Sequence, residues 1–336
     1  MTRVLIIGAG GMGKMHAGVY TSLSGARVVG VADSRLDAAQ TLAESIGARA
    51  YASAEEMLER ESADMADVCS PSYLHAQQVV LCLKKGLHVL CEKPLALNVA
   101  DAARMVRLAR ARRLTLMAAQ VIRFWAEFVY LRQAVRQNCY GRLRQLFLTR
   151  IGGTPRWSWD SWFLDPARSG AAPYDLHIHD LDFIYHLLGK PLAVQSFRVQ
   201  SADCFTSYIK TGYDYGNDLL VEAESGWYHS SHPFSAGYRA VFEGGVLSYR
   251  DNQLAFYPAE GEPQKIQLDS AAFSIDAGIN ISAAGPYFNE IDYFVDCVRS
   301  GKPVDIALPE ESVEVLRVLR AELLSAAQGR KIRLSS

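Results

Sequence analysis

The sequence predicts an α/β protein: an N-terminal Rossmann dinucleotide-binding domain, then an α/β domain with a large, mostly antiparallel open sheet. Short apolar runs alternate with helical patterns from residue 3 to about 120, as in βαβ units with a parallel sheet. A glycine-rich turn follows the first of these runs. Longer stretches with alternating polar and apolar residues then dominate, which is typical of antiparallel strands.

The composition is that of an ordinary globular protein. Its 336 residues are 49% hydrophobic and 21% charged, and this length predicts about two domains. A net charge of −1 gives no electrostatic sign of binding to nucleic acid or anionic lipid. The six cysteines lie far apart, which favours free thiols over disulfides. No signal peptide and no membrane span of about 18 apolar residues is expected, so we predict a cytoplasmic protein.

The first domain is expected to span residues 1–120. Its predicted strands are Val4–Ile7, Arg27–Ala32, Ala66–Cys69, Leu87–Cys91 and Thr115–Ala119. Apolar residues recur every three or four positions in three intervening segments, which predicts the helices Asp37–Ile46, Leu74–Lys85 and Val99–Arg112.

The second domain is expected to span residues 121–310. After a helix at 126–137, the alternating stretches predict strands at 144–151, 193–201, 218–227 and 238–242. Gly244-Gly245 predicts a β-hairpin. The last segment, 311–336, is expected to form a helix and tail that pack back on the first domain.

The glycine-rich turn carries the main cofactor signal. Gly8-Ala9-Gly10-Gly11-Met12-Gly13 has the G-x-G-x-x-G spacing, which permits a tight turn and the approach of a pyrophosphate to the helix N-terminus. Asp33 ends the second predicted strand, where an acid accepts hydrogen bonds from the adenosine ribose. This carboxylate would repel a 2′-phosphate and therefore favours NAD. Arg35 could reach such a phosphate and keeps NADP as the alternative.

Further cofactor contacts are expected after later strands. Ser70, Pro71 and His75 follow the strand that ends at Cys69, and small residues with a rigid proline suit a backbone that runs along the cofactor. A simple turn with a helix cap is the alternative for this segment. We also assign Glu92, Lys93 and Gln120 to the cofactor contacts.

The candidate catalytic groups are Lys93, Asp175 and His179. Lys93 follows a predicted strand, on the edge where open α/β sheets bind ligands. Asp175 and His179 lie one helical turn apart, and at about 100° per residue they share a polar stripe with Asp182 and His186. His177 falls among the apolar positions of the same helix, which predicts a packed or interface histidine. A lysine, an aspartate and a histidine beside a nicotinamide are suited to moving a proton during hydride transfer.

Other uses of these residues stay open. Asp175 and His179 could form half of a metal site, but a nearby lysine opposes a cation, and we predict no metal. They could also be polar residues on an exposed helix face. Arg123 could contact the substrate or brace the hinge between the domains. Four of the five tryptophans, including Trp162, precede the Asp175 helix; their flat faces suit a sugar, and core packing or a subunit interface is the alternative.

These motifs, in this order, resemble the glucose–fructose oxidoreductase / inositol dehydrogenase / MocA (Gfo/Idh/MocA) family over nearly the whole chain. The resemblance depends on the glycine turn, Asp33, the Ser70–His75 segment, Arg123-Phe124 and two specific elements, Glu92-Lys93-Pro94 and the Asp175–Asp182 segment. It implies a catalytic lysine at Lys93 and an acid–histidine pair at Asp175 and His179. It also implies an open sheet whose exposed face mediates homodimers or homotetramers.

The resemblance further implies an NAD(P)-dependent oxidoreductase that acts on a secondary hydroxyl of a sugar, cyclitol or glycoside. His179 would accept the hydroxyl proton, Asp175 would orient His179, and Lys93 would donate to the developing oxyanion; either Lys93 or His179 could be the formal base. Gly170-Ala171-Ala172 and His177 depart from the family pattern beside the substrate pocket and caution against copying a relative's substrate.

Three alternatives remain. The first is a glycoside-processing enzyme with internally recycled NAD. The second is a regulator that senses a dinucleotide or sugar, which the intact catalytic set disfavours. The third is bilin reduction on a similar fold. It is disfavoured because that reaction does not need the Asp175–His179 pair.

Overall fold

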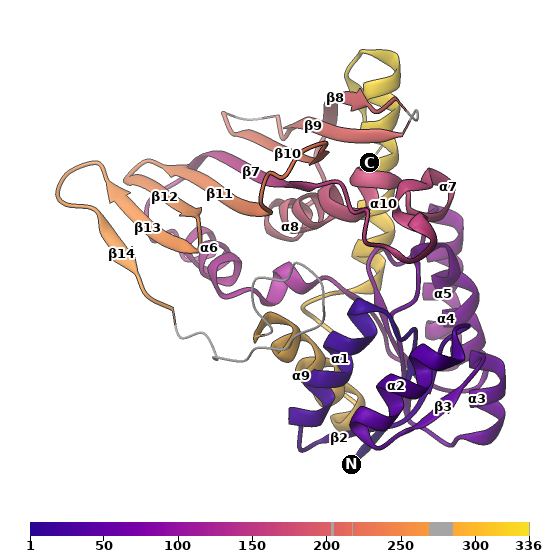
Figure 1. Ribbon diagram of the computed structural model, residues 1–336. Coiled ribbons are helices and arrows are strands. Elements are labelled where there is room, and N and C mark those ends of the chain that lie inside the picture. The colour runs from indigo at the N-terminus through magenta and orange to yellow at the C-terminus, as the bar shows by residue number, and fades with distance from the viewer. Residues whose placement is uncertain (203–204, 217, 269–284, 336) are drawn as a thin grey trace. The chain divides into compact units, whose positions relative to one another are not determined.

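The computed structural model describes residues 1–202, 205–216, 218–268 and 285–335, which divide into two compact units (Figure 1). The described residues of the first unit are 1–124 and 285–313, and those of the second are 125–268, apart from the gaps, and 314–335. No helix in these ranges is long and apolar enough to cross a membrane.

The first unit is built on a parallel six-stranded sheet with the strand order β3-β2-β1-β4-β5-β6. This is the order of a Rossmann fold, in which the strand order reverses between β1 and β4. The strands are β1 (Thr2–Ile7), β2 (Ala26–Ala32), β3 (Arg49–Tyr51), β4 (Met65–Val68), β5 (His88–Glu92) and β6 (Leu116–Ala119). The five strands predicted from the sequence are confirmed, and β3 was missed.

Helices surround this sheet. They are α1 (Gly11–Ser22), α2 (Leu36–Ile46), α3 (Ala54–Arg60), α4 (His75–Lys84), α5 (Val99–Arg112), α9 (Gly285–Ser300) and the 3₁₀ segments η1 (Ser72–Leu74) and η2 (Val121–Phe124). The sequence placed residues up to 310 in the second domain, and for α9 this was wrong. Ile291 and Phe294 of α9 are fully buried in the same core as Val4 and Ile6 of β1, so apolar packing assigns α9 to the first unit.

The second unit is built on a nine-stranded sheet with the order β14-β13-β12-β11-β7-β10-β9-β8-β15. Only β7 and β10 pair in parallel, so the predicted mostly antiparallel sheet is confirmed. The strands are β7 (Leu143–Gly153), β8 (Ala193–Gln200), β9 (Thr206–Asp214), β10 (Leu220–Tyr228), β11 (Ser235–Phe242), β12 (Gly245–Arg250), β13 (Gln253–Pro258), β14 (Gln264–Ile266) and β15 (Ile332–Arg333). The predicted hairpin at Gly244-Gly245 joins β11 to β12.

Helices of the second unit lie against its sheet (Figure 1). They are α6 (Ala126–Arg136), η3 (Trp159–Leu164), α7 (Pro166–Ser169), the π-helical turn η4 (Pro173–His177), α8 (Ile178–Leu188) and α10 (Pro309–Gln328), whose residues from 314 on belong here.

The C-terminal segment packs differently from the expectation. We expected residues 311–336 to pack on the first domain, but β15 pairs with β8 of the second unit. Ser325 of α10 accepts a hydrogen bond from the backbone N–H of Ser196 at 3.0 Å. Buried polar groups on α10 therefore find their partners in the second unit, which accounts for the position of the tail.

Candidate active site

The glycine turn between β1 and α1 has the shape that a dinucleotide needs. Gly8 has φ +107°, and a Cβ there would lie 2.7 Å from the backbone nitrogen of Ser70. A Cβ on Gly13 would lie 1.9 Å from the Gly8 carbonyl oxygen, whereas a Cβ on Gly10 would meet nothing within 4 Å. Gly10 is the N-cap of α1, and no side chain caps this helix. The closed side of the turn and its open side at Gly10 together fit a pyrophosphate on the helix amides. Gly11 and Met12, in the first turn of α1, are partly exposed on this side.

Asp33 is fixed beside this turn. Its Oδ2 accepts a hydrogen bond from the backbone N–H of Ala9 at 2.8 Å, and its Oδ1 accepts one from the backbone N–H of Arg35 at 2.9 Å. These bonds fix the orientation of the carboxylate, and its assignment to the ribose stays a prediction. The Arg35 side chain is 38% exposed, with Nε 3.7 Å from Asp33 Oδ1, which is a weak surface pair. The assignment of Arg35 to a phosphate stays a prediction.

His75 joins two loops at the edge of the parallel sheet. The imidazole is buried, with Nδ1 2.8 Å from the carbonyl oxygen of Pro94 and Nε2 2.8 Å from that of Ser70. Burial lowers the pKa of His75. These contacts connect the segment after β4, which includes Pro71, to the segment after β5, and they favour a structural role over direct cofactor contact.

Gln120 follows β6 and is only 2% exposed. Its side-chain oxygen Oε1 has no hydrogen-bond partner among the described residues. An unsatisfied buried acceptor costs about 1–3 kcal/mol, and an amide donor placed here would remove that cost. The carboxamide of a nicotinamide carries such a donor, so this group fits the predicted contact.

Lys93 directly follows β5 and is half-buried. The backbone N–H of Lys93 donates to Oε2 of Glu92 at 3.0 Å, and the Lys93–Pro94 peptide is cis. This hydrogen bond favours a role for Glu92 in positioning Lys93 over the cofactor contact assigned from the sequence.

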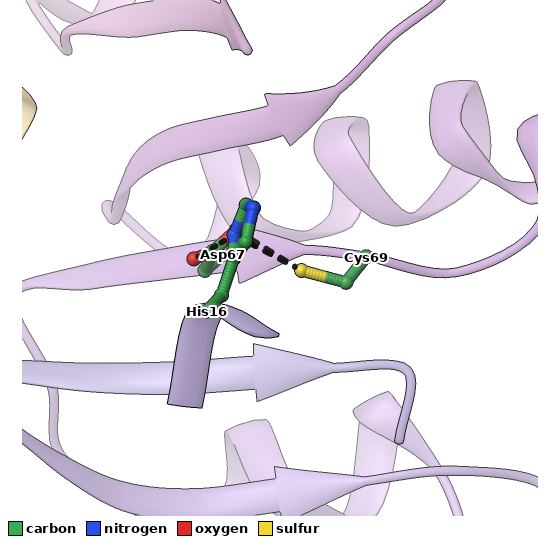
Figure 2. A group of neighbouring side chains, drawn as sticks. All are labelled: His16, Asp67 and Cys69. Carbon is green, nitrogen blue, oxygen red and sulfur yellow. Dashed lines mark hydrogen bonds and ion pairs between the residues drawn. The ribbon is translucent and has the colours of Figure 1, made fainter. Parts of the chain in front are cut away.

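A buried cluster of His16, Asp67 and Cys69 lies next to Glu92 and was missed by the sequence analysis (Figure 2). His16 comes from α1 and Asp67 from β4, and both side chains are fully covered. One feature of the sequence could have indicated this cluster. Asp67 is an ionisable residue inside the otherwise apolar strand Met65–Val68, and a buried carboxylate needs polar partners.

The second unit presents Asp175 and His179 on the segment that runs from η4 into α8. Both side chains are half-buried, and Asp175 Oδ2 accepts a hydrogen bond from Trp227 Nε1 at 3.2 Å. Asp182, which the sequence placed on the same polar stripe, is fully buried. The stripe assumed α-helical geometry throughout, but the π-helical turn at 173–177 changes the angle between Asp175 and the rest of the helix.

His177 is buried, as predicted for a packed histidine. Its Nε2 lies 3.0 Å from Oε2 of Glu322, and its Nδ1 lies 3.3 Å from Oγ of Ser225. The Tyr213 hydroxyl lies 3.2 Å from the same Nε2. His177 therefore connects η4 to the sheet and to α10.

Aromatic rings extend from Asp175 to the surface. Trp227 is 6.2 Å from Phe163, which stacks on Trp162 at 4.0 Å, both measured between ring centroids. Trp157 lies 5.5 Å from Phe163 and is 60% exposed. These rings form one aromatic group with Trp227, the hydrogen-bond donor to Asp175. The group supports the assignment of Trp162 to substrate binding, which stays a prediction.

Arg123 is better explained as a brace. Its side chain is fully covered, donates to the carbonyl oxygen of Ile306 at 2.8 Å and pairs with Glu311. These partners favour the brace over the substrate contact, because they already satisfy the guanidinium inside the first unit.

The parallel sheet and the glycine turn define an NAD-binding oxidoreductase. The profile of the oxidoreductase family with an NAD-binding Rossmann fold matches residues 2–120, and the Gfo/Idh/MocA C-terminal domain matches residues 128–248. Together these matches cover most of the chain, and the protein belongs to the Gfo/Idh/MocA family. The resemblance stated from the motifs is thereby confirmed.

Named relatives give further comparisons. D-Glucoside 3-dehydrogenase of Escherichia coli K12 is 28% identical, over 99% of this chain and 97% of its own. Myo-inositol 2-dehydrogenase of Thermotoga maritima is 32% identical, over 56% of this chain and 55% of its own. The solved structure of a levoglucosan dehydrogenase with NADH and levoglucosan has a TM-score of 0.86 at 18% identity, with complete coverage of both chains, and is similar in fold.

Proposed function

We propose that this protein is an NAD-dependent dehydrogenase that oxidises a secondary hydroxyl of a sugar, cyclitol or glycoside, with C3 of a D-glucoside as the first position to test. The observation that carries the proposal is the end-to-end similarity to a D-glucoside 3-dehydrogenase, which spans 99% of the chain. Asp33 supports NAD over NADP, because its fixed carboxylate would repel a 2′-phosphate.

The proposed chemistry assigns one task to each side chain. NAD, held by the glycine turn and Asp33, would supply the hydride acceptor for the carbinol carbon. His179 takes the proton of the substrate hydroxyl, and Asp175 holds the imidazole and stabilises its charge. Lys93 donates a hydrogen bond to the oxygen that becomes the ketone. The hydroxyl proton and the carbinol hydrogen thus leave in separate directions, and a C=O bond forms.

The test is a panel of D-glucosides, free sugars and cyclitols, assayed by NADH absorbance with NAD and NADP in parallel. We expect turnover with NAD and a glycoside or sugar. Lys93→Ala and His179→Ala should each lower kcat by about 10²–10⁴-fold, while NAD binding is retained. Near-normal turnover in both variants would remove the catalytic assignment. If no compound of the panel yields NADH or NADPH and NAD stays bound through purification, internal cofactor recycling would become the better proposal than net oxidation.

We also propose that the protein forms a homo-oligomer through its nine-stranded sheet. Phe197 and Val199 of β8 are 63% and 57% exposed, and Leu220 of β10 is 52% exposed. Exposed apolar residues on nearby strands support an interface. Light scattering of the purified protein tests this, and a monomer at all concentrations would contradict it.

A further inference from the structure

The buried cluster in the first unit centres on an imidazole between two acids. His16 Nδ1 lies 2.8 Å from Oδ2 of Asp67, and His16 Nε2 lies 3.1 Å from Oε1 of Glu92. The three side chains are 0%, 0% and 7% exposed. His16 Nδ1 hydrogen-bonds Asp67, whereas Nε2 faces Glu92 at an ion-pair distance without hydrogen-bond geometry. In either neutral tautomer, one nitrogen lone pair would face an ionised carboxylate, so the two acids favour the imidazolium form of His16.

The other groups that face the imidazole agree with this charge. Tyr20 of α1 donates to Asp67 Oδ2 at 2.8 Å, and the Cys69 thiol lies 3.4 Å from Asp67 Oδ1. From α9, the ring of Tyr287 lies 6.2 Å from the imidazole ring, and the carboxyl of Glu290 adds another negative charge near Tyr20. No cation faces His16 in this group. Burial alone would lower the pKa of His16, but Asp67 and Cys69 raise it well above its ordinary value.

The spacing of the donor atoms distinguishes a proton from a metal ion in this cluster (Figure 2). Two ligands of one tetrahedral zinc ion, each about 2.0 Å from the metal, lie about 3.3 Å apart. His16 Nδ1 and Asp67 Oδ2 are only 2.8 Å apart, which is the length of a charge-assisted hydrogen bond. The second ring nitrogen is directed to Glu92 rather than to a shared centre. The geometry therefore indicates a bound proton.

The cluster leads directly to the proposed catalytic lysine. Glu92 uses one carboxylate oxygen for His16 and the other for the backbone N–H of Lys93. His16 comes from α1, so it connects the helix after the glycine turn to β5, the strand that Lys93 follows. If Glu92 were displaced, the backbone N–H of Lys93 would lose its side-chain hydrogen-bond acceptor.

We propose that His16 is a positioning residue for the dehydrogenase reaction: as an imidazolium it holds Glu92 and Asp67, and through Glu92 it fixes Lys93. This inference depends on the proposed function, because it takes Lys93 to be catalytic. Glutamine at position 16 could donate to one acid at most and carries no charge. A displacement of Lys93 by about 1 Å is enough to lower turnover by about a hundredfold.

The test compares His16→Gln with His88→Gln. His88 lies at the opposite end of β5 from Glu92, is half-buried, and accepts a hydrogen bond from the backbone N–H of Thr115. We expect His16→Gln to lower kcat by about 10–100-fold, with NAD affinity changed by less than about threefold. His88→Gln should keep the wild-type kcat. A folded His16→Gln protein with wild-type kcat would overturn the inference.

A second measurement does not depend on the variant's folding. The ¹⁵N NMR spectrum of the wild-type imidazole should show two protonated ring nitrogens above the ordinary pKa of histidine, at about pH 8. A neutral ring at that pH, or a metal ion found on Asp67 and Cys69, would overturn the inference. Lys93→Ala separates the two proposals: if it retains turnover, the catalytic assignment fails. If it abolishes turnover while His16→Gln does not, only the role of His16 fails.

Discussion

A fully covered histidine in each unit, His16 and His177, lies near a proposed catalytic group, and the two histidines have different partners. His16 lies between the carboxylates of Asp67 and Glu92. His177 lies near one carboxylate, Glu322, and two hydroxyl groups, those of Ser225 and Tyr213. The first histidine lies between two acids, whereas the second has one acid and two hydroxyl groups beside it. Similar burial therefore does not imply similar dependence on charge.

The acids near the two histidines also differ in their other partners. In the second unit, Asp180 is fully buried but receives two hydrogen bonds from Arg150, at 3.2 and 2.9 Å. Burial together with the charge of Glu322 raises the pKa of Tyr213. Asp180 therefore has a cationic partner of its own, independent of His177. In the first unit, Asp67 keeps only neutral donors if His16 is removed.

The largest expected effect is on folding stability. His16→Phe leaves two buried carboxylates without their cation, and we expect a loss of about 3–5 kcal/mol in the free energy of unfolding. His177→Phe leaves one carboxylate, that of Glu322, without its imidazole neighbour, and we expect a loss of about 1–3 kcal/mol. Urea denaturation of both variants measures the difference. Equal losses would show that the two histidines are equivalent packing residues.

A smaller effect is expected on the pH dependence of stability. A raised pKa in the folded protein means that the His16 contribution is complete below the ordinary pKa of 6.5. It declines as the pH rises above that value and is lost once the pH passes the raised pKa. His75 acts in the opposite sense, because its lowered pKa makes acid destabilising. The raised pKa values of Tyr20 and Cys69 also lower stability at alkaline pH, so the measurement needs a variant.

The measurement compares thermal unfolding of wild type and His16→Gln from neutral to alkaline pH. The wild type should lose stability over this range, and the variant should lose less. Parallel curves would mean that His16 takes no part in the pH dependence, and would weaken the assignment of an imidazolium.

Much of the fold could be predicted from the sequence because it depends on local patterns. The buried runs of β1, β2, β4, β5 and β6 are continuous and apolar, and the glycine turn has a fixed spacing. The strand β3 has three residues with one fully buried, which is too short for a periodic signal. The assignment of α9 to the first unit depends on packing across a long stretch of sequence, which periodicity does not report.

The candidate site could be predicted only where its residues belong to a recognisable sequence motif. Lys93 and the Asp175–His179 pair have distinctive neighbours and spacing. His16 and Glu92 are far apart in sequence, and their contact follows from β1, β4 and β5 being adjacent in the sheet. Trp227 was the tryptophan outside the group of four, and only the pairing of β10 with β7 and β9 brings it to Asp175.

The smallest expected effect is on kcat, in a variant of the second unit that changes the orientation of Asp175 but not its charge. Trp227→Phe keeps an aromatic ring against Phe163 and Phe205 but removes the Nε1–H that donates to Asp175. Asp175 would keep its charge and lose one fixed direction, so we expect kcat to fall by about three- to tenfold, the equivalent of about 1 kcal/mol. KM and NAD affinity should stay near wild type. Steady-state kinetics on the best substrate of the panel measures both quantities. A rise in KM with unchanged kcat would instead assign Trp227 to substrate binding rather than to the orientation of Asp175.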